Sequence, residues 1–194
     1  MTIRVAAPAL LFSILAATAA QADCKSDIDA ILQAMQTAPP YRMVLETEAD
    51  GGATKMEATA ILPDRIRMKG DGMEMILTPN GFWMGKDGKL QKSPPEAAEQ
   101  MREMIKQGMN IGVKAVEAPE CAGQASFEGG SYELYKYTAN GDFMGIKSTS
   151  SVEMYVNSDG RPEWMVIDGE AMGIKSKTKQ HITYDDSITI ADPN

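Results

Sequence analysis

The chain has 194 residues, of which 43% are hydrophobic and 24% are charged, and its formal net charge is −8. This length is typical of one ordinary domain that buries a hydrophobic core. The acidic balance repels nucleic acid and anionic membrane surfaces, so we expect neither as a partner.

The N-terminal segment has the pattern of a secretory signal peptide. Arg4 provides a basic start, residues 5–20 carry no charge, and Ala20-Gln21-Ala22 is a small-x-small cleavage pattern. The apolar run is too short for a convincing membrane span, so no span is expected after cleavage. We therefore expect residues 1–22 to be removed and residues 23–194 to work as one domain in a bacterial periplasm.

The two cysteines, Cys24 and Cys121, are expected to form one disulfide, as is usual in an exported chain. The bridge would connect the start of the first helix to a loop far along the chain, which stabilises by about 4–5 kcal/mol in the chain-entropy picture. Lipid attachment at Cys24 is disfavoured by the charged Asp23 before it. Because no Cys-x-x-Cys motif occurs, a thiol oxidoreductase is not expected.

The first predicted helix covers residues 26–37. Its apolar side chains recur at helical spacing from Ile28 to Met35, Ser26 can cap its first turn, and Pro39-Pro40 ends it. Alternating apolar and polar residues separated by glycine-containing turns then predict short antiparallel strands. These strands cover residues 41–49, 54–62, 65–69, 73–78, 81–85 and 89–92.

A second helix begins at the capping box Ser93-Pro94-Pro95-Glu96 and is expected to end at Gly108. Residues 109–116 are ambiguous, and residues 119–124 are predicted as a loop that carries Cys121. Strands return from residue 125 onward. Their predicted ranges include 146–156, 162–168, 172–184 and a final short strand at 187–190.

The order of helix, about six strands, helix and about five strands predicts an α+β fold. We expect a curved antiparallel sheet, a half-barrel, whose concave face is covered by the N-terminal helix and the central helix. Three stretches resemble the LolA/LolB-like lipoprotein-carrier fold of periplasmic lipid carriers. They are Tyr41-Arg-Met-Val-Leu-Glu46 after its helix, Thr78–Met84 followed by the Pro-led helix, and the tail of Val152–Pro162 with Thr183–Pro193. The resemblance implies a hydrophobic ligand cavity, and no functional residue of that superfamily is transferred.

Catalytic chemistry has few candidates in this sequence. His181 is the one histidine and lies in a polar stretch typical of a surface strand. No Gly-x-Ser-x-Gly motif or EF-hand loop occurs, so acyl transfer and calcium binding lack their usual residues. We therefore interpret the chain as a binding protein rather than an enzyme, without a cofactor or metal.

Methionine is unusually frequent, with 15 residues against four phenylalanines. Its flexible thioether side chain suits apolar surfaces that adapt to different ligands. We therefore predict a carrier for a lipid, a lipoprotein acyl chain or another amphiphile, with an envelope protein as a possible partner. The side chains predicted for the wall and lid of the cavity are Met73, Met75, Phe82, Trp83, Met84, Met101 and Met104.

Two alternatives remain open at this point. Thioethers bind Cu(I), so the pairs Met73-x-Met75 and Met101-x-x-Met104 allow a copper-binding module. The other alternative is an envelope interaction domain that has no small ligand and holds a protein partner through its sheet edge or helices.

Overall fold

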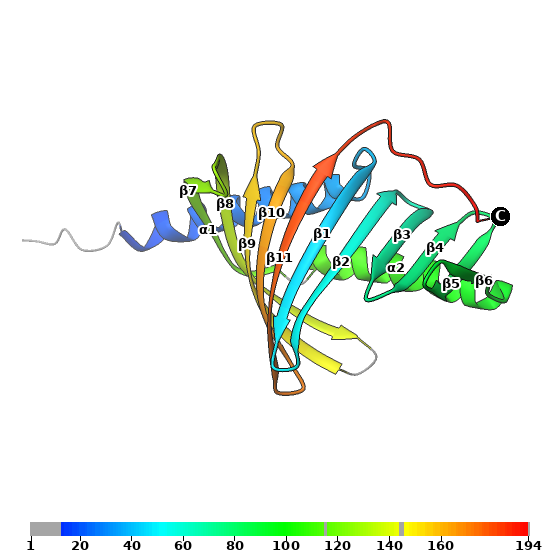
Figure 1. Ribbon diagram of the computed structural model, residues 1–194. Coiled ribbons are helices and arrows are strands. Elements are labelled where there is room, and N and C mark those ends of the chain that lie inside the picture. The colour runs from blue at the N-terminus through cyan, green and yellow to red at the C-terminus, as the bar shows by residue number, and fades with distance from the viewer. Residues whose placement is uncertain (1–12, 115, 144–145, 194) are drawn as a thin grey trace, which may run out of the picture.

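The computed structural model describes residues 13–114, 116–143 and 146–193, and shows one large curved antiparallel sheet with two helices on the same side (Figure 1). This is the predicted α+β architecture. The elements are α1 (Ser13–Met35), β1 (Tyr41–Ala49), β2 (Gly52–Ile61), β3 (Arg65–Gly70), β4 (Met73–Thr78), β5 (Gly81–Lys86), β6 (Lys89–Lys92), α2 (Pro95–Lys114), β7 (Val116–Phe127), β8 (Gly130–Phe143), β9 (Ile146–Val156), β10 (Pro162–Ala171) and β11 (Ile174–Tyr184).

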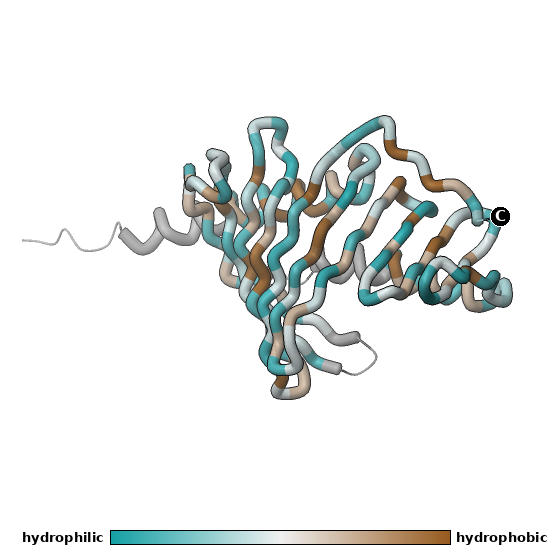
Figure 2. Tube along the Cα trace, viewed as in Figure 1, coloured by the Kyte–Doolittle hydropathy of each residue, from teal (hydrophilic) through white to brown (hydrophobic). Residues whose placement is uncertain are grey.

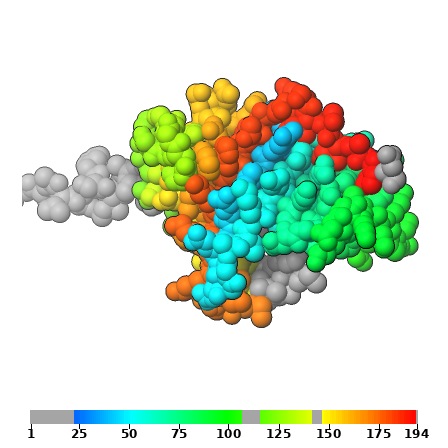
Figure 3. All heavy atoms as spheres, viewed as in Figure 1, coloured from blue at the N-terminus to red at the C-terminus, as the bar shows by residue number. Residues whose placement is uncertain are grey.

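The sheet consists of two meanders joined at its centre. Its strand order is β6-β5-β4-β3-β2-β1-β11-β10-β9-β8-β7, so the first and last strands of the chain pair with each other. Figure 3 shows them side by side as adjoining cyan and red surfaces. Each helix packs on the meander that does not follow it directly: α1 lies against β7–β10, and α2 lies against β4 and β5.

Strand register shows that both helices cover the same face of the sheet. Met165 of β10 packs under α1. The cross-strand partners that follow from Met165 toward β4 include Leu45, Met56 and finally Met73, so all of them lie on one face of the sheet. Residues two apart share a face of a strand, so Met73 lies on the same side as Met75 and Leu77, which pack under α2. We call this side the inner face and the opposite side the outer face. Apolar and polar residues alternate along the strands accordingly (Figure 2).

The tail after β11 runs past the ends of several strands instead of forming the short strand predicted at 187–190 (Figure 1). Ile188 and Ile190 are buried, which explains the alternating pattern that suggested a strand. The tail is held by side chains: Arg65 Nη1 donates to the Ile190 carbonyl at 2.9 Å, and Thr78 Oγ1 donates to Asp192 at 2.5 Å.

Several other predicted bounds differ from the structure, and three of the differences are large. Helix α1 begins at Ser13 rather than at residue 26, because the Ala-rich stretch before Cys24 continues the helix. Helix α2 continues past Gly108 and Gly112 to Lys114, since a glycine inside a helix costs only about 1 kcal/mol. The predicted loop at 119–124 belongs to β7, where two register shifts accommodate its irregular backbone.

Candidate ligand-binding site

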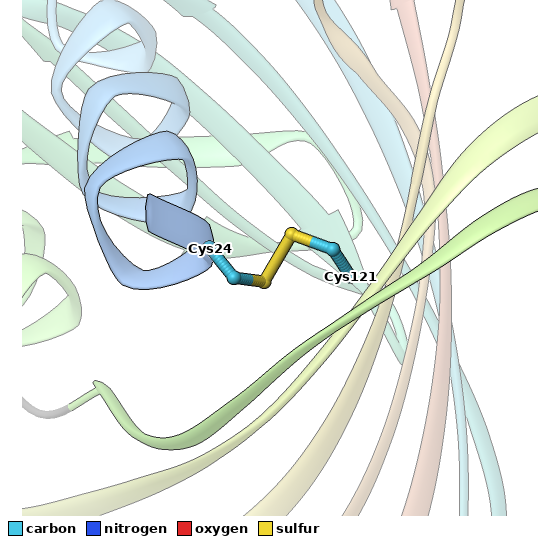
Figure 4. The surroundings of a disulfide bond; sticks show 2 residues. All are labelled: Cys24 and Cys121. Carbon is cyan, nitrogen blue, oxygen red and sulfur yellow. A yellow bond between two sulfur atoms is a disulfide. The ribbon is translucent and has the colours of Figure 1, made fainter. Parts of the chain in front are cut away.

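The predicted disulfide is confirmed and fixes α1 to the edge strand of the sheet. Cys24 of α1 and Cys121 of β7 have Cα atoms 5.6 Å apart (Figure 4). The Cys24 side of the bridge is buried, whereas Cys121 belongs to an exposed stretch of β7. The bridge therefore holds the middle of α1 on the inner face, where Cys24 and Ile28 contribute to the core.

Under α1 the inner face is a closely packed core. Ile28 of α1 and Met154 of β9 are fully buried, at 0% exposure. Burial raises the pKa of Tyr137 to about 12 from its ordinary value near 10, because the ionised phenolate would lose its hydration. The side chains of this core are Cys24, Ile28, Val116, Tyr137, Val152, Met154 and Val156, with Ile31, Leu32, Tyr135, Ala139, Met165 and Ile167 against them.

Under α2 the buried cluster is much smaller. Its fully enclosed members are Leu77, Phe82 and Ala98, and Met75, Ala97, Met101 and Ile105 pack against them. Arg102 attaches the helix to the sheet, since its Nη2 donates to the Thr78 carbonyl at 2.9 Å and to the Pro79 carbonyl at 3.3 Å. Arg102 thus fixes the first half of α2 to the end of β4 and the turn that follows it.

Two adjacent rows of the inner face are rich in methionine, and we call them the methionine rows. In the first row the paired residues are Met43, Ala58, Met68, Met75 and Met84, from β1 to β5. In the second row they are Met154, Met165, Gln180, Leu45, Met56, Gly70 and Met73, from β9 to β4. Eight methionines from seven strands thus share one surface.

Part of this surface is open to solvent. Met56, Met73 and Met84 are 39%, 41% and 42% exposed, although a methionine on a helix-covered face is usually buried. Met104 of α2 is also partly exposed, at 39%. The rows therefore pass from a closed core under α1 to an accessible apolar surface on β2, β4 and β5.

The structure brings most of the predicted wall residues together. Met73, Met75, Phe82 and Met84 lie on the inner face of β4 and β5. Met101 packs on the cluster around Leu77, and Met104 lies on the flank of the same helix.

Trp83 is placed elsewhere. It alternates with Phe82 and Met84 along β5, so its side chain lies on the outer face, where it is 8% exposed and Lys92 Nζ lies 5.1 Å from its ring centroid. Met154 and Met165, which complete the second row, were not among the predicted wall residues. The alternation of Val152, Met154 and Val156 is the signal that could have identified the first of them.

The outer face carries its own aromatic cluster, which includes the single histidine. The rings of His181 and Trp164 are stacked with centroids 4.0 Å apart, and Lys179 Nζ lies 5.0 Å from the Trp164 ring. Burial and the neighbouring Glu153 raise the pKa of Tyr155 to about 12. His181 is thus held by stacking on a strand, and Glu46, Lys55 and Lys179 line the same small pocket.

No group of three or more His, Cys, Asp or Glu side chains is arranged to hold a metal ion within those residues. Neither helix has, over its described residues, the length and apolar character that crossing a membrane requires.

Comparison with solved structures identifies the fold. LprF from Mycobacterium bovis superposes with a TM-score of 0.59 at 11% identity, covering 89% of this chain and 97% of LprF. The Mycobacterium tuberculosis lipoprotein LppX superposes with a TM-score of 0.61 at 10% identity, covering 88% of this chain and 99% of LppX. A LolA superfamily protein from Nitrosomonas europaea is also similar, with a TM-score of 0.36 at 9% identity over 86% of this chain and 94% of its own.

The chain therefore shares its fold with LprF and LppX over most of its length. No family model matches the chain, and no curated protein matches it. At these identities the likeness establishes the fold and assigns no ligand, so function must be argued from the inner face itself.

Proposed function

We propose that this protein is an exported carrier or binding protein for an amphiphile, whose apolar part lies against the methionine rows of the inner face. The observation that supports this most directly is the exposure of Met56, Met73 and Met84 on a face whose other half is a closed core. Exposed apolar area of this kind, gathered on one surface beside two helices, is typical of a ligand-binding groove.

The chemistry of the face favours a flexible hydrocarbon over a rigid polar ligand. Methionine side chains have rotatable bonds and polarizable sulfur, so they adapt to chains of different shape. Covering the exposed area would contribute roughly 25 cal/mol per Å² before ordering costs. Along β1 and β11 the face becomes polar toward the hairpins, where Thr47 and Thr178 share a hydrogen bond of 2.9 Å. A headgroup could therefore lie beyond the methionines while an acyl chain contacts them.

The predicted signal peptide and the disulfide support a location outside the cytoplasm. The carrier would therefore work in the periplasm. A binding role without catalysis agrees with the position of His181 on the outer face, away from the methionine rows. An envelope protein that donates or receives the ligand would be the partner.

The test is to make the accessible methionines polar without changing their size. The variant Met56→Gln/Met73→Gln/Met84→Gln replaces three half-exposed side chains, so the fold should persist. Binding of a fluorescent fatty acid, followed by titration, should weaken more than tenfold, which corresponds to about 1.4 kcal/mol or more. The matched control is Met172→Gln, on the β10–β11 hairpin, where the side chain is 78% exposed.

Native mass spectrometry of the protein purified from the periplasm provides a second readout. A heterogeneous adduct of lipid mass, lost on delipidation and absent from the triple Gln variant, is the expected result. Unchanged fatty-acid binding in the triple variant would refute the proposed surface. A bare mass together with no fatty-acid binding in the wild type would instead favour an interaction domain without a small ligand.

A further inference from the structure

Three methionines of the first row stand directly beside one another on consecutive strands. Met68 of β3 pairs with Met75 of β4, and Met75 pairs with Met84 of β5. We call these three residues the methionine ladder. All three side chains lie on the inner face, and Met73, two residues before Met75, lies on the same face next to them.

The spacing of the ladder allows its three sulfur atoms to converge. Directly opposed side chains of antiparallel strands have Cβ atoms about 4.5–5.5 Å apart. Met75 is therefore one such step from each of its neighbours. Because a methionine sulfur lies at the end of rotatable bonds, the outer two side chains can lean toward the central one.

The donor set selects the type of metal. Thioether sulfur is a soft, neutral ligand, which favours Cu(I) and its analogue Ag(I) over magnesium, calcium or manganese. No cluster of His, Cys, Asp or Glu competes for such an ion among the residues that the structure describes. The neutral ligands leave the positive charge of the ion uncompensated, and a chain of net charge −8 favours its approach.

Access to the ladder comes from the open side of the inner face. Met84 at one end is 42% exposed, and the neighbouring Met73 is 41% exposed. By contrast, Met154 under α1 is fully buried and has Met165 and Tyr135 as its cross-strand partners, so it offers no comparable accessible cluster.

We propose that Met68, Met75 and Met84 form a thioether site for one Cu(I) ion. This site is distinct from the amphiphile-binding function, although it shares the same surface. Binding involves no change in oxidation state: the ion enters as Cu(I) and exchanges its previous ligands for the three sulfur atoms.

The test compares two triple variants in titrations with Ag(I), a redox-stable probe, and with Cu(I) held reduced by ascorbate without oxygen. Met68→Leu/Met75→Leu/Met84→Leu removes the sulfurs and keeps the surface apolar. Met43→Leu/Met165→Leu/Met172→Leu is the control, with the same number of substitutions outside the ladder. We expect one equivalent bound by the wild type and the control, and at least a hundredfold weaker binding by the ladder variant.

Methyl NMR of labelled methionine identifies the ligands independently. Ag(I) should shift the methyl signals of Met68, Met75 and Met84, while those of Met154 and Met172 stay in place. The proposal is overturned if the wild type binds neither ion, if the ladder variant binds as tightly as the control, or if all methionine methyls shift alike. Fatty-acid binding is measured on the wild type, which carries all its methionines, so a failure of the metal site and a failure of the carrier function remain distinguishable.

Discussion

The two halves of the inner face use the same sheet in opposite ways. The half under α1 is closed by a disulfide and a large cluster in which Ile28 and Met154 are fully buried. The half under α2 has a small cluster around Leu77 and leaves Met73 and Met84 about two-fifths exposed. Among the side chains that the structure describes, the half under α1 therefore holds more of the buried core, and the half under α2 presents more exposed apolar area.

This difference explains why methionine has two roles in one chain. Met154 fills a closed space as any large apolar residue would. Removing its side chain would therefore leave a cavity and lower the free energy of unfolding. The half-exposed methionines cannot contribute as much to packing, and the proposed function assigns their apolar character to ligand binding. The contrast predicts that equal substitutions in the two halves will have unequal effects on stability.

The largest effect is expected at the disulfide. Replacing both cysteines with alanine, Cys24→Ala/Cys121→Ala, removes a cross-link between residues 97 apart in the sequence. Loop-closure entropy predicts a loss of about 4–5 kcal/mol from the free energy of unfolding, less any strain relieved in the native state. Urea unfolding of the oxidised wild type and the variant measures it. A loss below about 1 kcal/mol would show that the core holds α1 without the cross-link.

Next in size is the contrast between two methionines. Met154→Ala should lower the free energy of unfolding by about 2–5 kcal/mol, because a fully buried side chain leaves a cavity. Met84→Ala should lower it by less than about 1 kcal/mol, because its site is already partly open to water. Urea unfolding of both variants gives the comparison, and equal losses would contradict the division into a closed and an open half.

The sequence predicted most of the fold because local signals agree with the tertiary structure. Strands 41–49, 73–78 and 146–156 were placed at their observed bounds from alternation and glycine turns. The errors occurred where tertiary contacts decide the outcome. The 187–190 stretch alternates like a strand, yet it packs as a tail through buried isoleucines and the Arg65 contact.

The candidate surface was only partly predictable. Period-two alternation places Phe82 and Met84 on one face and Trp83 on the other, but all three are apolar. Nothing in that short run indicates which face the helices cover. The cross-strand pairing of Met68, Met75 and Met84 depends on register between strands, which hairpin lengths suggest and only the folded sheet establishes.

A third prediction uses pH to probe the closed half. Burial raises the pKa of Tyr137 to about 12, whereas in the unfolded chain it titrates near 10. Its contribution is fully present below pH 10 and is lost between about pH 10 and 12, on the order of 2 kcal/mol, because only the unfolded chain ionises there. The variant Tyr137→Phe should show a shallower fall of unfolding free energy across that window in urea titrations. Identical slopes for the two proteins would show that Tyr137 is hydrated in the folded state.

The smallest predicted effect concerns how α2 is attached to the open half. Arg102→Gln removes the charged donor to the carbonyls of Thr78 and Pro79 and should lower the free energy of unfolding by about 1 kcal/mol. Glu99→Gln is the control, because the Glu99–Arg102 pair is 3.6 Å long, Glu99 is 75% exposed, and such surface pairs contribute little. Thermal unfolding of the two variants checks this, and Arg102→Gln should lower the unfolding temperature more than Glu99→Gln does.

The same pair of variants separates attachment of α2 from stability of the whole sheet. If Arg102 fastens the helix only to the β4–β5 turn, amide exchange should quicken in α2 and around Pro79 while the core under α1 keeps its protection. Faster exchange throughout both halves would mean that the open half unfolds together with the core. That result would contradict the independence on which the contrast between the two halves rests.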